Sequence, residues 1–366
     1  MFVLDPSETC GYSLEEQLNL LEDVKSMEIP MIVSQNKSDL KYIADIPIKM
    51  SAKNKDIESL KREKVDVIFG YPGGAVLPFY DEIYGSDIRH ILVRHEQCAA
   101  HAADGYARTT AKVGVAVATS GPGCTNLVTG IANAFMDSSP VVAITGQVPR
   151  RMIGKDAFQE TDAVGIMMPI TKHNYQIRTA EEIPVVFKEA FKLAIMGRPG
   201  PVHIDVPSDV QMEEADIKFP KDVSTRGYSP TYKGHPKQIK RVLDLLANSE
   251  RPIIIAGGGV IIANASQELL RFAEAIQAPV VTTLMGKGAI PENHYLALGM
   301  IGMHGRKWAN KAVADADLII AVGTRFSDRS TGNVEYFATD AKTVSYTHLR
   351  AHETRHDLVC SLLLEK

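Results

Sequence analysis

Residues 67–74 read Val-Ile-Phe-Gly-Tyr-Pro-Gly-Gly, and residues 114–123 read Gly-Val-Ala-Val-Ala-Thr-Ser-Gly-Pro-Gly. Each stretch is an apolar run that ends in a glycine turn, which is typical of a buried strand in a parallel sheet. Strands and helices are expected to alternate around them, which predicts an α/β fold whose parallel sheet is flanked by helices. The expected strands are 67–69, 113–119, 141–145 and 202–206, and the expected helices include 96–108 and 126–136.

A second series of the same kind follows a polar stretch that contains Pro220, Pro230 and Pro236. Glycines 257–259 directly follow its first strand, which suits close approach of a diphosphate, although they do not form a Gly-x-Gly-x-x-Gly fingerprint. Its expected strands are 252–256, 280–283 and 318–322, and its expected helices are 239–247, 266–276 and 308–314. The sequence therefore predicts two α/β domains, at 59–213 and 237–343, joined by a linker at 214–236.

The composition excludes several classes of protein. With 366 residues, 23% of them charged and 45% hydrophobic, the chain has the make-up of a globular protein, and its formal charge of -4 gives no general attraction to nucleic acid or anionic lipid. Its four cysteines form no Cys-x-x-Cys pair, so neither a disulfide framework nor a zinc knuckle is indicated. No apolar run approaches the roughly 18 to 20 residues of a membrane span. We expect a cytoplasmic protein with no nucleic-acid or membrane partner.

Three short motifs carry candidate chemistry in the first domain. The turn at 70–75 lets a backbone approach a bound group closely, because glycine has no side chain. The turn at 120–123 joins a strand to a helix N-terminus, where backbone donors converge on a polar ligand. Between them, Glu96 opens a helix. A glutamate held there among apolar neighbours can share a proton with a ring nitrogen, and the alternative is an acid that merely caps the helix.

A family resemblance emerges when these motifs are taken with four others further along the chain. The four are Thr145-Gly146-Gln147-Val148-Pro149, Ala157-Phe158-Gln159-Glu160, Thr171-Lys172-His173-Asn174-Tyr175 and Gly197-Arg198-Pro199-Gly200-Pro201-Val202. In this order they resemble the catalytic large subunit of acetolactate synthase, also called acetohydroxyacid synthase, a thiamine-diphosphate enzyme. The resemblance runs from about residue 66 to residue 343. It implies a pyrimidine-binding domain followed by part of a Rossmann-like central FAD-binding domain.

The resemblance also implies an activity, which is decarboxylation of pyruvate and carboligation to pyruvate or 2-oxobutyrate in valine, leucine and isoleucine biosynthesis. Glu96 would bond the pyrimidine N1′ of thiamine diphosphate and so promote removal of the C2 proton. Phe158 and Gln159 would line the substrate channel, with Pro149 and Arg151 near its mouth; core packing is the alternative for Phe158. The residues expected beside thiamine diphosphate are Gly73, Gly74, Ala75, Ser120 and Gly121.

FAD is implied as a structural cofactor, so no net redox chemistry follows from it. Its implied contacts are Arg198 in the first domain and, in the second, Gly257, Gly258, Gly259, Thr283, Leu284, Gly302, His304, Gly323, Arg325, Asp328 and Arg329. Mg2+ is implied with its ligands in a C-terminal domain that the sequence lacks, so no metal ligand is expected here and the chain alone is expected to be truncated and inactive. A homodimer or higher homo-oligomer and a regulatory small subunit are the implied protein partners.

Four positions depart from the family pattern. Cys98 replaces an expected glycine and is expected to add volume beside Glu96, and Cys124 replaces an expected alanine. Ser208 replaces a lysine, and Ser327 replaces an aspartate.

The two ends of the chain differ from this pattern. Residues 1–58, with the turns Asn36-Lys37-Ser38-Asp39 and Ser51-Ala52-Lys53, resemble the C-terminal fragment of a Nog1-type GTPase domain, in which such a turn offers a carboxylate to guanine. No Gly-x-x-x-x-Gly-Lys-Ser/Thr motif occurs to hold phosphates, so we expect very weak guanine recognition and a foreign origin. Residues 344–366 resemble a translated sequencing adapter with no evolved structure. We therefore reject a zinc site at His348, His352 and His356, despite their helical spacing.

Two other interpretations stay open. Pyruvate oxidase and glyoxylate carboligase share the glutamate and the central fold with acetolactate synthase. A GTPase-derived binding protein, with residues 36–39 as its functional centre, is the alternative from a different class.

Overall fold

The computed structural model describes residues 2–4, 15, 33–35, 55–215, 218–225, 227–230 and 234–346. The chain divides into two compact units, residues 1–53 and 54–366. In the first unit, β1 (Phe2–Leu4) and β2 (Val33–Gln35) pair in parallel, with Phe2 opposite Val33. The two turns expected to recognise guanine, at 36–39 and 51–53, lie outside the described residues.

The first domain of the second unit is built on a six-stranded parallel sheet in the order β4-β3-β5-β6-β8-β7. Its strands are β3 (Val67–Gly70), β4 (Arg89–Leu92), β5 (Gly114–Ala118), β6 (Val141–Gln147), β7 (His173–Gln176) and β8 (Val202–Pro207). The four predicted strands are confirmed. β4 and β7 were not predicted, because both are edge strands whose end residues are exposed, and they lack the buried apolar run of the inner strands.

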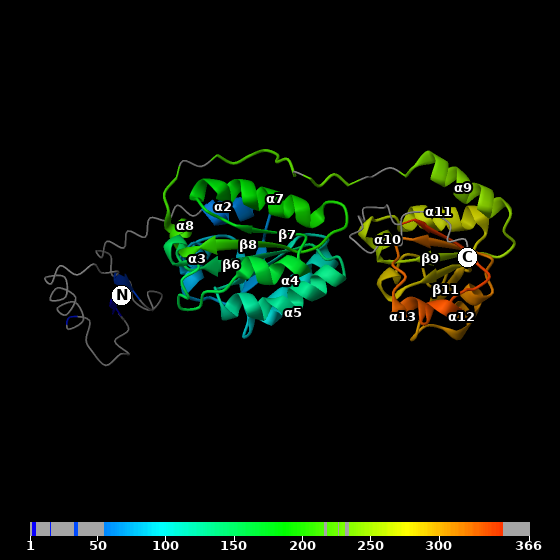
Figure 1. The fold of residues 1–366 in the computed structure, drawn as a ribbon, viewed down its shortest axis with the longest axis horizontal. Coiled ribbons are helices and arrows are strands. Elements are labelled where there is room, and N and C mark those ends of the chain that lie inside the picture. The colour runs from blue at the N-terminus through cyan, green and yellow to red at the C-terminus, as the bar shows by residue number, and fades with distance from the viewer. Residues whose placement is uncertain are drawn as a thin grey trace. The chain divides into compact units, whose positions relative to one another are not determined.

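Helices cover both faces of this sheet, as Figure 1 shows. They are α2 (Lys55–Arg62), α3 (Leu77–Tyr84), α4 (Glu96–Thr110), α5 (Pro122–Met136), α6 (Ala163–Met167), α7 (Ile183–Ile195) and α8 (Ser208–Met212), with the short 3-10 helix η1 (Gly74–Val76) after β3. The alternation of side chains along β5 assigns the faces. Val115 and Val117 pack in the core with α2, α3 and α7, whereas Ala116 and Ala118 pack in the core with α4 and α5.

Small residues bring α4 and α5 close to the sheet and to each other. A Cβ added to Gly114 of β5 would lie 2.0 Å from the carbonyl oxygen of Ala103 in α4. A Cβ added to Gly130 of α5 would lie 2.4 Å from the Cβ of Ala100. The position of α4, whose first residue is Glu96, is therefore set by contacts that leave no room for a larger side chain.

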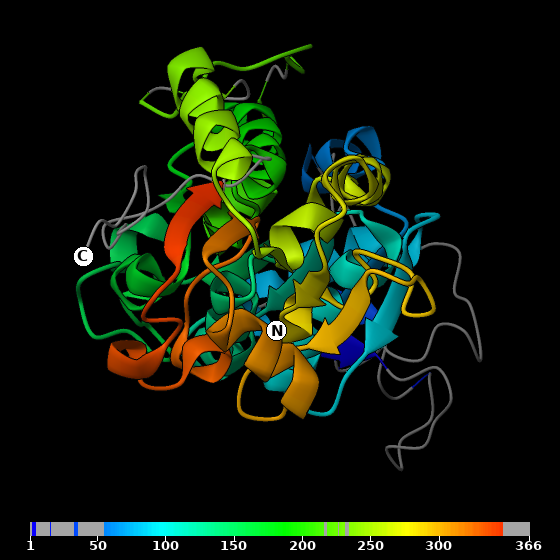
Figure 2. The same ribbon diagram turned by 90° about the vertical axis from the view of Figure 1, so that its right-hand side faces the viewer.

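The second domain contains a five-stranded parallel sheet in the order β11-β10-β9-β12-β13 (Figure 2). Its strands are β9 (Pro252–Ala256), β10 (Val280–Thr282), β11 (Ala297–Met300), β12 (Leu318–Val322) and β13 (Lys342–Tyr346). Its helices are α9 (Pro236–Ala247), α10 (Gly258–Ile262), α11 (Ser266–Ile276), α12 (Lys307–Ala314) and α13 (Asp328–Thr331). Ile254 of β9 packs in a core with α10 and α11, and its neighbours Ile253 and Ile255 pack in another with α12.

The C-terminal boundary predicted for this domain needs a correction. The boundary at residue 343 falls inside β13, which pairs with β12 from Lys342, opposite Leu318, to Tyr346, opposite Val322. The first three residues of the segment expected to have no evolved structure therefore belong to the sheet. Residues 347–366, including the three histidines, lie outside the described residues. The boundary predicted between residues 58 and 59 also needs a correction, because it falls inside α2 (Lys55–Arg62), whose Ile57 and Leu60 pack in the core of the first domain.

Candidate active site

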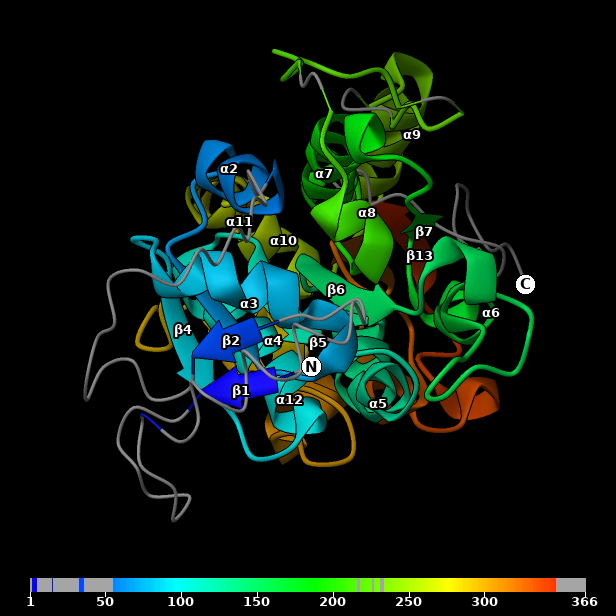
Figure 3. The ribbon, with the colours of Figure 1, turned by 90° about the vertical axis from the view of Figure 1, so that its left-hand side faces the viewer.

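The glycine turns of the first domain meet where the strand order reverses. The chain runs from β3 to β4 on one side and later to β5 on the other side, so the turns after β3 and β5 are neighbours at the C-terminal edge of the sheet. Figure 3 labels β4 and β5, the strands on either side of β3. Ligands of open α/β sheets bind at this kind of reversal in strand order. A Cβ added to Gly73 would lie 2.6 Å from the Cβ of Thr119, and the backbone N–H of Ala75 donates to Thr119 Oγ1 at 3.2 Å. Gly74, in contrast, has open space beside it.

Glu96 is buried at this edge, with 8% of its surface exposed. His95 is the N-cap of α4, and its side chain accepts the backbone N–H of Gln97, so Glu96 does not cap the helix. The side chain of Asn126 in α5 donates instead to Glu96 Oε2 at 2.9 Å. Within the described residues, no hydrogen bond or ion pair engages Oε1. The carboxylate therefore has one oxygen fixed by the protein and one available to a ligand.

Sequence reasoning missed both side chains that accompany Glu96. Asn126 looked like an ordinary first residue of a helix. Tyr80 of α3 has a buried hydroxyl without a partner in the described part of the chain, and burial and the charge of Glu96 raise the pKa of Tyr80. That hydroxyl lies 2.1 Å from where a Cβ on Gly70 would be, so Gly70 makes room for it at the end of β3. Neither residue stands in a motif that signals a site.

The loop that carries Phe158 and Gln159 touches the same edge. Gly121 has a φ of +57°, and a Cβ there would lie 2.5 Å from the carbonyl oxygen of Gln159. The side chain of Phe158 is 87% exposed, so the alternative of core packing is wrong for this residue. The Glu160 carboxylate accepts the backbone N–H groups of Gly154, Lys155 and Ala157, and these hydrogen bonds lower the pKa of Glu160.

Pro149 and Arg151 flank the start of this loop, where Pro149 is half-buried and Arg151 is exposed. Ser120 is buried in the β5–α5 turn beside Gly121. Cys98, which was expected to add volume beside Glu96, is exposed, whereas Cys124 is buried and its pKa is raised by that burial to about 12.

Arg198 lies at the other edge of the sheet. It precedes β8, whereas Glu96 and the glycine turns follow strands, so the structure does not bring Arg198 together with them. Its Nε donates to Ser138 Oγ at 2.7 Å, beside a cavity of about 650 Å³ that Lys172 and Tyr228 also line. Lys172 donates to the carbonyl oxygens of Leu193 and Met196 at the end of α7, and burial lowers the pKa of Lys172 to about 7.

The glycines of the second domain also meet at a reversal of strand order, between β9 and β12. The backbone N–H of Gly257 donates to Val322 O at 2.9 Å, and that of Gly259 donates to Gly323 O at 2.8 Å. A Cβ added to Gly257 would lie 2.3 Å from Gly323 O, so the turns after β9 and β12 both have glycine at the point where they touch. The backbone N–H of Thr283, after β10, donates to the carbonyl of the last residue of β9 at 2.9 Å.

A second group of predicted contacts follows β11. The backbone N–H of Met303 donates to Arg329 O at 3.1 Å, and a Cβ added to Gly302 would lie 2.1 Å from the same oxygen. Leu284, His304, Arg325 and Asp328 are exposed. The predicted FAD contacts of this domain therefore follow the C-terminal ends of its strands, and many of them are backbone groups or exposed side chains.

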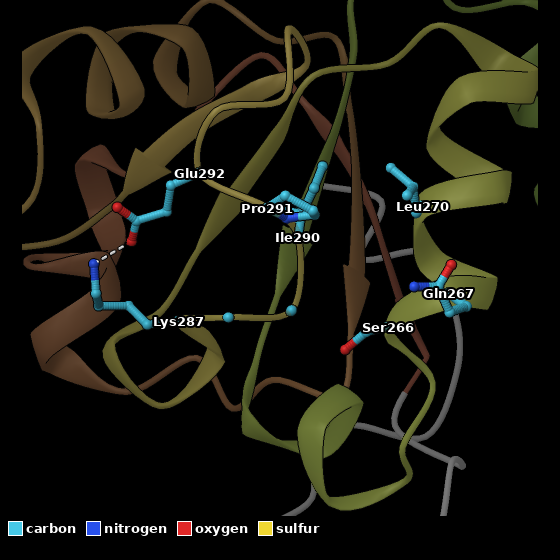
Figure 4. A pocket seen from close by; sticks show the side chains of 9 residues that line it. Ser266, Gln267, Leu270, Lys287, Ile290, Pro291 and Glu292 are labelled. Atoms are coloured by element: carbon cyan, nitrogen blue, oxygen red, sulfur yellow. Dashed lines mark hydrogen bonds and ion pairs between the residues drawn. The ribbon is translucent and has the colours of Figure 1, made fainter.

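A different hollow of this domain contains none of those residues. It has a volume of about 490 Å³ and lies between α11, which contributes Ser266, Gln267 and Leu270, and the loop 287–292. Figure 4 shows the ion pair between Lys287 and Glu292 at one end of it. No motif in the sequence indicates a ligand there.

Metal-binding clusters and membrane-spanning helices are both absent from the described residues. No group of three or more histidine, cysteine, aspartate or glutamate side chains in them is placed to hold a metal ion. Among those same residues, no helix has the length and apolar character needed to cross a membrane.

Comparison with known families agrees with this architecture. Residues 50–166 match the family described as thiamine pyrophosphate enzyme, N-terminal TPP binding domain, and residues 239–358 match the thiamine pyrophosphate enzyme central domain. The chain therefore carries the N-terminal and central domains of thiamine pyrophosphate enzymes. The central-domain match extends past residue 343 into the segment that resembles an adapter. Residues 1–39 match the family of nucleolar GTP-binding protein 1.

Within that class, the chain is a homologue of acetolactate synthase large subunits. It is 62% identical over 291 residues to the "Probable acetolactate synthase large subunit" of Methanocaldococcus jannaschii, covering 79% of this chain and 49% of that protein. Identity to the acetolactate synthase of Arthrospira platensis is 54%, covering 79% of this chain and 51% of that protein. Identity to the acetolactate synthase large subunit of Corynebacterium glutamicum is 52%, covering 81% of this chain and 48% of that protein. The chain spans about half the length of the curated relatives it matches.

Proposed function

We propose that this chain provides the N-terminal and central domains of an acetolactate synthase, which decarboxylates pyruvate and joins the product to pyruvate or 2-oxobutyrate. The observation that carries the proposal is the buried carboxylate of Glu96, with Oε2 held by Asn126, at the edge of the sheet where the turns after β3 and β5 are neighbours. The relatives named above support it, since two of them are 62% and 52% identical to this chain over 291 and 299 residues.

Thiamine diphosphate, when bound, supplies the ring that accepts the electrons released by decarboxylation. The described residues fit its pyrimidine in two respects. Glu96 keeps Oε1 available to hold a proton at N1′, and the open space at Gly74 leaves room for a ring beside the backbone. Gly73, Ala75, Ser120 and Gly121 would border the ring with backbone groups. Phe158 and Gln159 would line the path of the keto acid, a role that the exposure of Phe158 favours.

FAD would bind as a structural cofactor at the C-terminal ends of β9, β10, β11 and β12. The close backbone approach of Gly257 and Gly259 to Gly323 supports this proposal, because a Cβ at any of them would clash with the facing backbone and keep the turns after β9 and β12 apart. Arg198 would contact the same cofactor from the first domain. Mg2+ would act with the diphosphate of the thiamine cofactor, and we assign no magnesium ligand to the described residues.

A homo-oligomer and a regulatory small subunit are the proposed protein partners, in the cytoplasm. The proposed domains are 55–213 and 236–346, with a linker at 214–235. A foreign origin of residues 1–58 and of the adapter-like tail is a separate hypothesis. Resequencing the genomic locus across residues 57–65 and beyond residue 343 tests it.

A domain exchange tests the activity. Residues 60–343 would replace the matching segment of the Methanocaldococcus jannaschii relative, and the chimera would be assayed with pyruvate, thiamine diphosphate, Mg2+ and FAD. We expect acetolactate, and we expect Glu96→Gln to lower its rate roughly 100-fold or more, since positioned acid–base groups contribute about that much. Asp81→Asn, on the exposed side of α3, serves as the control. An active chimera whose rate is unchanged by Glu96→Gln would refute the role of Glu96.

The products separate the alternatives within the class. Acetate or acetyl phosphate with consumption of oxygen would indicate a pyruvate oxidase, and carboligation of glyoxylate but not of pyruvate would indicate a glyoxylate carboligase. A guanine-nucleotide binder is the alternative that the match of residues 1–39 favours. Titration of the full chain with labelled GDP tests it, and we expect no binding.

A further inference from the structure

The C-terminal ends of β6, β7 and β8 enclose a carboxylate that no cation balances in the described part of the chain. Asp205 of β8 is fully buried, and its Oδ1 accepts the Thr145 hydroxyl at 2.7 Å. Its Oδ2 accepts the side-chain amides of Gln147 at 3.1 Å and Gln176 at 3.0 Å. Burial raises the pKa of Asp205 to about 6 although these three donors lower it. Burial of this charge therefore destabilises the folded state, and stability alone does not explain why an aspartate is present.

Gln147 connects this carboxylate to a loop. The Nε2 that donates to Asp205 also donates to the carbonyl oxygen of Thr161 at 3.0 Å, while Oε1 accepts the backbone N–H of Val148 at 2.9 Å. A flipped amide would set Oε1 against both the carboxylate and the Thr161 carbonyl, so Asp205 determines which way the amide of Gln147 faces. One side chain thereby joins the two ends of the loop at 148–161.

This loop carries Phe158 and Gln159 to the edge where Glu96 lies. Near its start, Arg150 is held independently, because Arg150 Nε donates to Asp209 Oδ2 at 2.7 Å. The loop returns to the sheet at Thr161, whose carbonyl oxygen accepts the side-chain amide of Gln147 at 3.0 Å and the backbone N–H of Ala163 at 2.9 Å. A change in the hydrogen bond from Gln147 would therefore shift the second half of the loop, which contacts Gly121 through Gln159.

We propose that Asp205 is a positioning residue, which acts through Gln147 on the carbonyl of Thr161 to fix the loop that carries Phe158 and Gln159. The inference rests on the proposed function only for the claim that this loop lines the substrate path.

Hydrogen–deuterium exchange of the full chain tests the proposal without turnover. We expect peptides covering residues 148–161 to exchange roughly three- to tenfold faster in Gln147→Met and in Asp205→Asn, the effect of losing one hydrogen bond. Gln176→Met is the matched control, because it removes a different hydrogen bond to the same carboxylate, and we expect it to leave the loop unchanged. Peptides from β5 should be protected equally in every variant that folds. The double variant should exchange no faster than Gln147→Met alone, since Asp205 acts through Gln147.

A pH profile adds a readout that a purely structural role would not move. We divide the hydrogen–deuterium exchange rate of the loop amides by their intrinsic chemical rate at each pH. This ratio should rise in the wild type as the pH falls through about 6, and it should stay constant in Asp205→Asn. His203, Cys124 and Asp162 face Asp205 from β8, α5 and the start of α6. Burial lowers the pKa of His203 to about 3 and raises that of Cys124 to about 12, so neither titrates there, and Asp162→Asn tests the third group.

Equal loop exchange in Gln176→Met and Asp205→Asn would overturn the proposal, as would multiplicative effects in the double variant. Acetolactate is measured in none of these arms. A failed chimera assay and a failed exchange experiment are therefore separate outcomes.

Discussion

Replacing His203 by glutamine should make the first domain less sensitive to acid. His203 of β8 is fully buried, and its Nε2 lies 2.8 Å from Thr145 Oγ1. The Thr145 hydroxyl donates its proton to Asp205, so Nε2 must donate to Thr145, and Nδ1 has no partner among the described residues. Glutamine places an amide nitrogen near the position of Nε2. It keeps the donor and removes the titration.

The magnitude follows from the difference between two pKa values. Burial lowers the pKa of His203 from 6.5 to about 3, so between these values the unfolded chain binds a proton that the folded chain does not. The associated stability is fully present above pH 6.5 and is lost progressively as the pH falls toward 3. At a pH of about 4.5 the loss amounts to about 2.7 kcal/mol, from about two pH units at 1.36 kcal/mol each. Asp205, whose raised pKa has the opposite effect, is present in both proteins and cancels in the comparison.

Urea denaturation at pH values of about 4.5 and 7.5 measures this difference, with pulse labelling of β5 and β6 peptides to report on the first domain alone. We expect the free energy of unfolding to fall about 2.7 kcal/mol less in His203→Gln than in the wild type between these two conditions. His101→Gln, an exposed histidine of α4, is the control and should behave like the wild type. An unchanged pH dependence in His203→Gln would refute the reasoning, because no other titrating group differs between the two proteins.

Four further substitutions test the packing around the site. Gly121→Ala should destabilise the first domain by at least about 2 kcal/mol in thermal denaturation, since its φ is +57° and its Cβ would meet the Gln159 carbonyl, whereas Gly74→Ala should leave stability unchanged because the space beside it is open. Asn126→Leu should cost about 1–3 kcal/mol in urea denaturation and slow the chimera, because the Glu96 carboxylate then stays buried without its donor; unchanged stability and rate would contradict that role. Asp104→Asn should cost about 1–2 kcal/mol in urea denaturation, since it removes the buried carboxylate that pairs with Arg108 at 2.7 Å while Arg108 keeps its ion pair with Asp137 at 2.8 Å; a loss below about 0.5 kcal/mol would contradict this estimate.

The inner strands and the glycine turns were predictable from sequence because both depend on local composition. A strand covered on both faces needs an uninterrupted apolar run, as at β5, and a turn pressed against a neighbouring chain needs glycine, as at Gly73 and Gly121. The edge strands β4 and β7 and the half-buried β11 were missed, because strands that are incompletely covered carry no such run.

The partners of the candidate site were less predictable. The motif indicated Glu96, but its donor, Asn126, is 30 residues away and is brought to it only by the packing of α5 on α4. The network around Asp205 joins three strands, and none of its residues stands in a sequence motif that predicts their contact. Arg198 has a place in the motif order, yet only the strand topology assigns it to the opposite edge of the sheet.

The alanine-lined face of β5 packs directly beneath Ala103 of α4. A methyl group added at Gly114 would clash with the carbonyl oxygen of Ala103 and displace the helix, and with it Glu96 at the first position of α4. The position of the Glu96 carboxylate therefore depends on residues such as Gly114 that lie beneath the helix. Variation at such positions offers a route to altered rates that a search confined to the site would overlook.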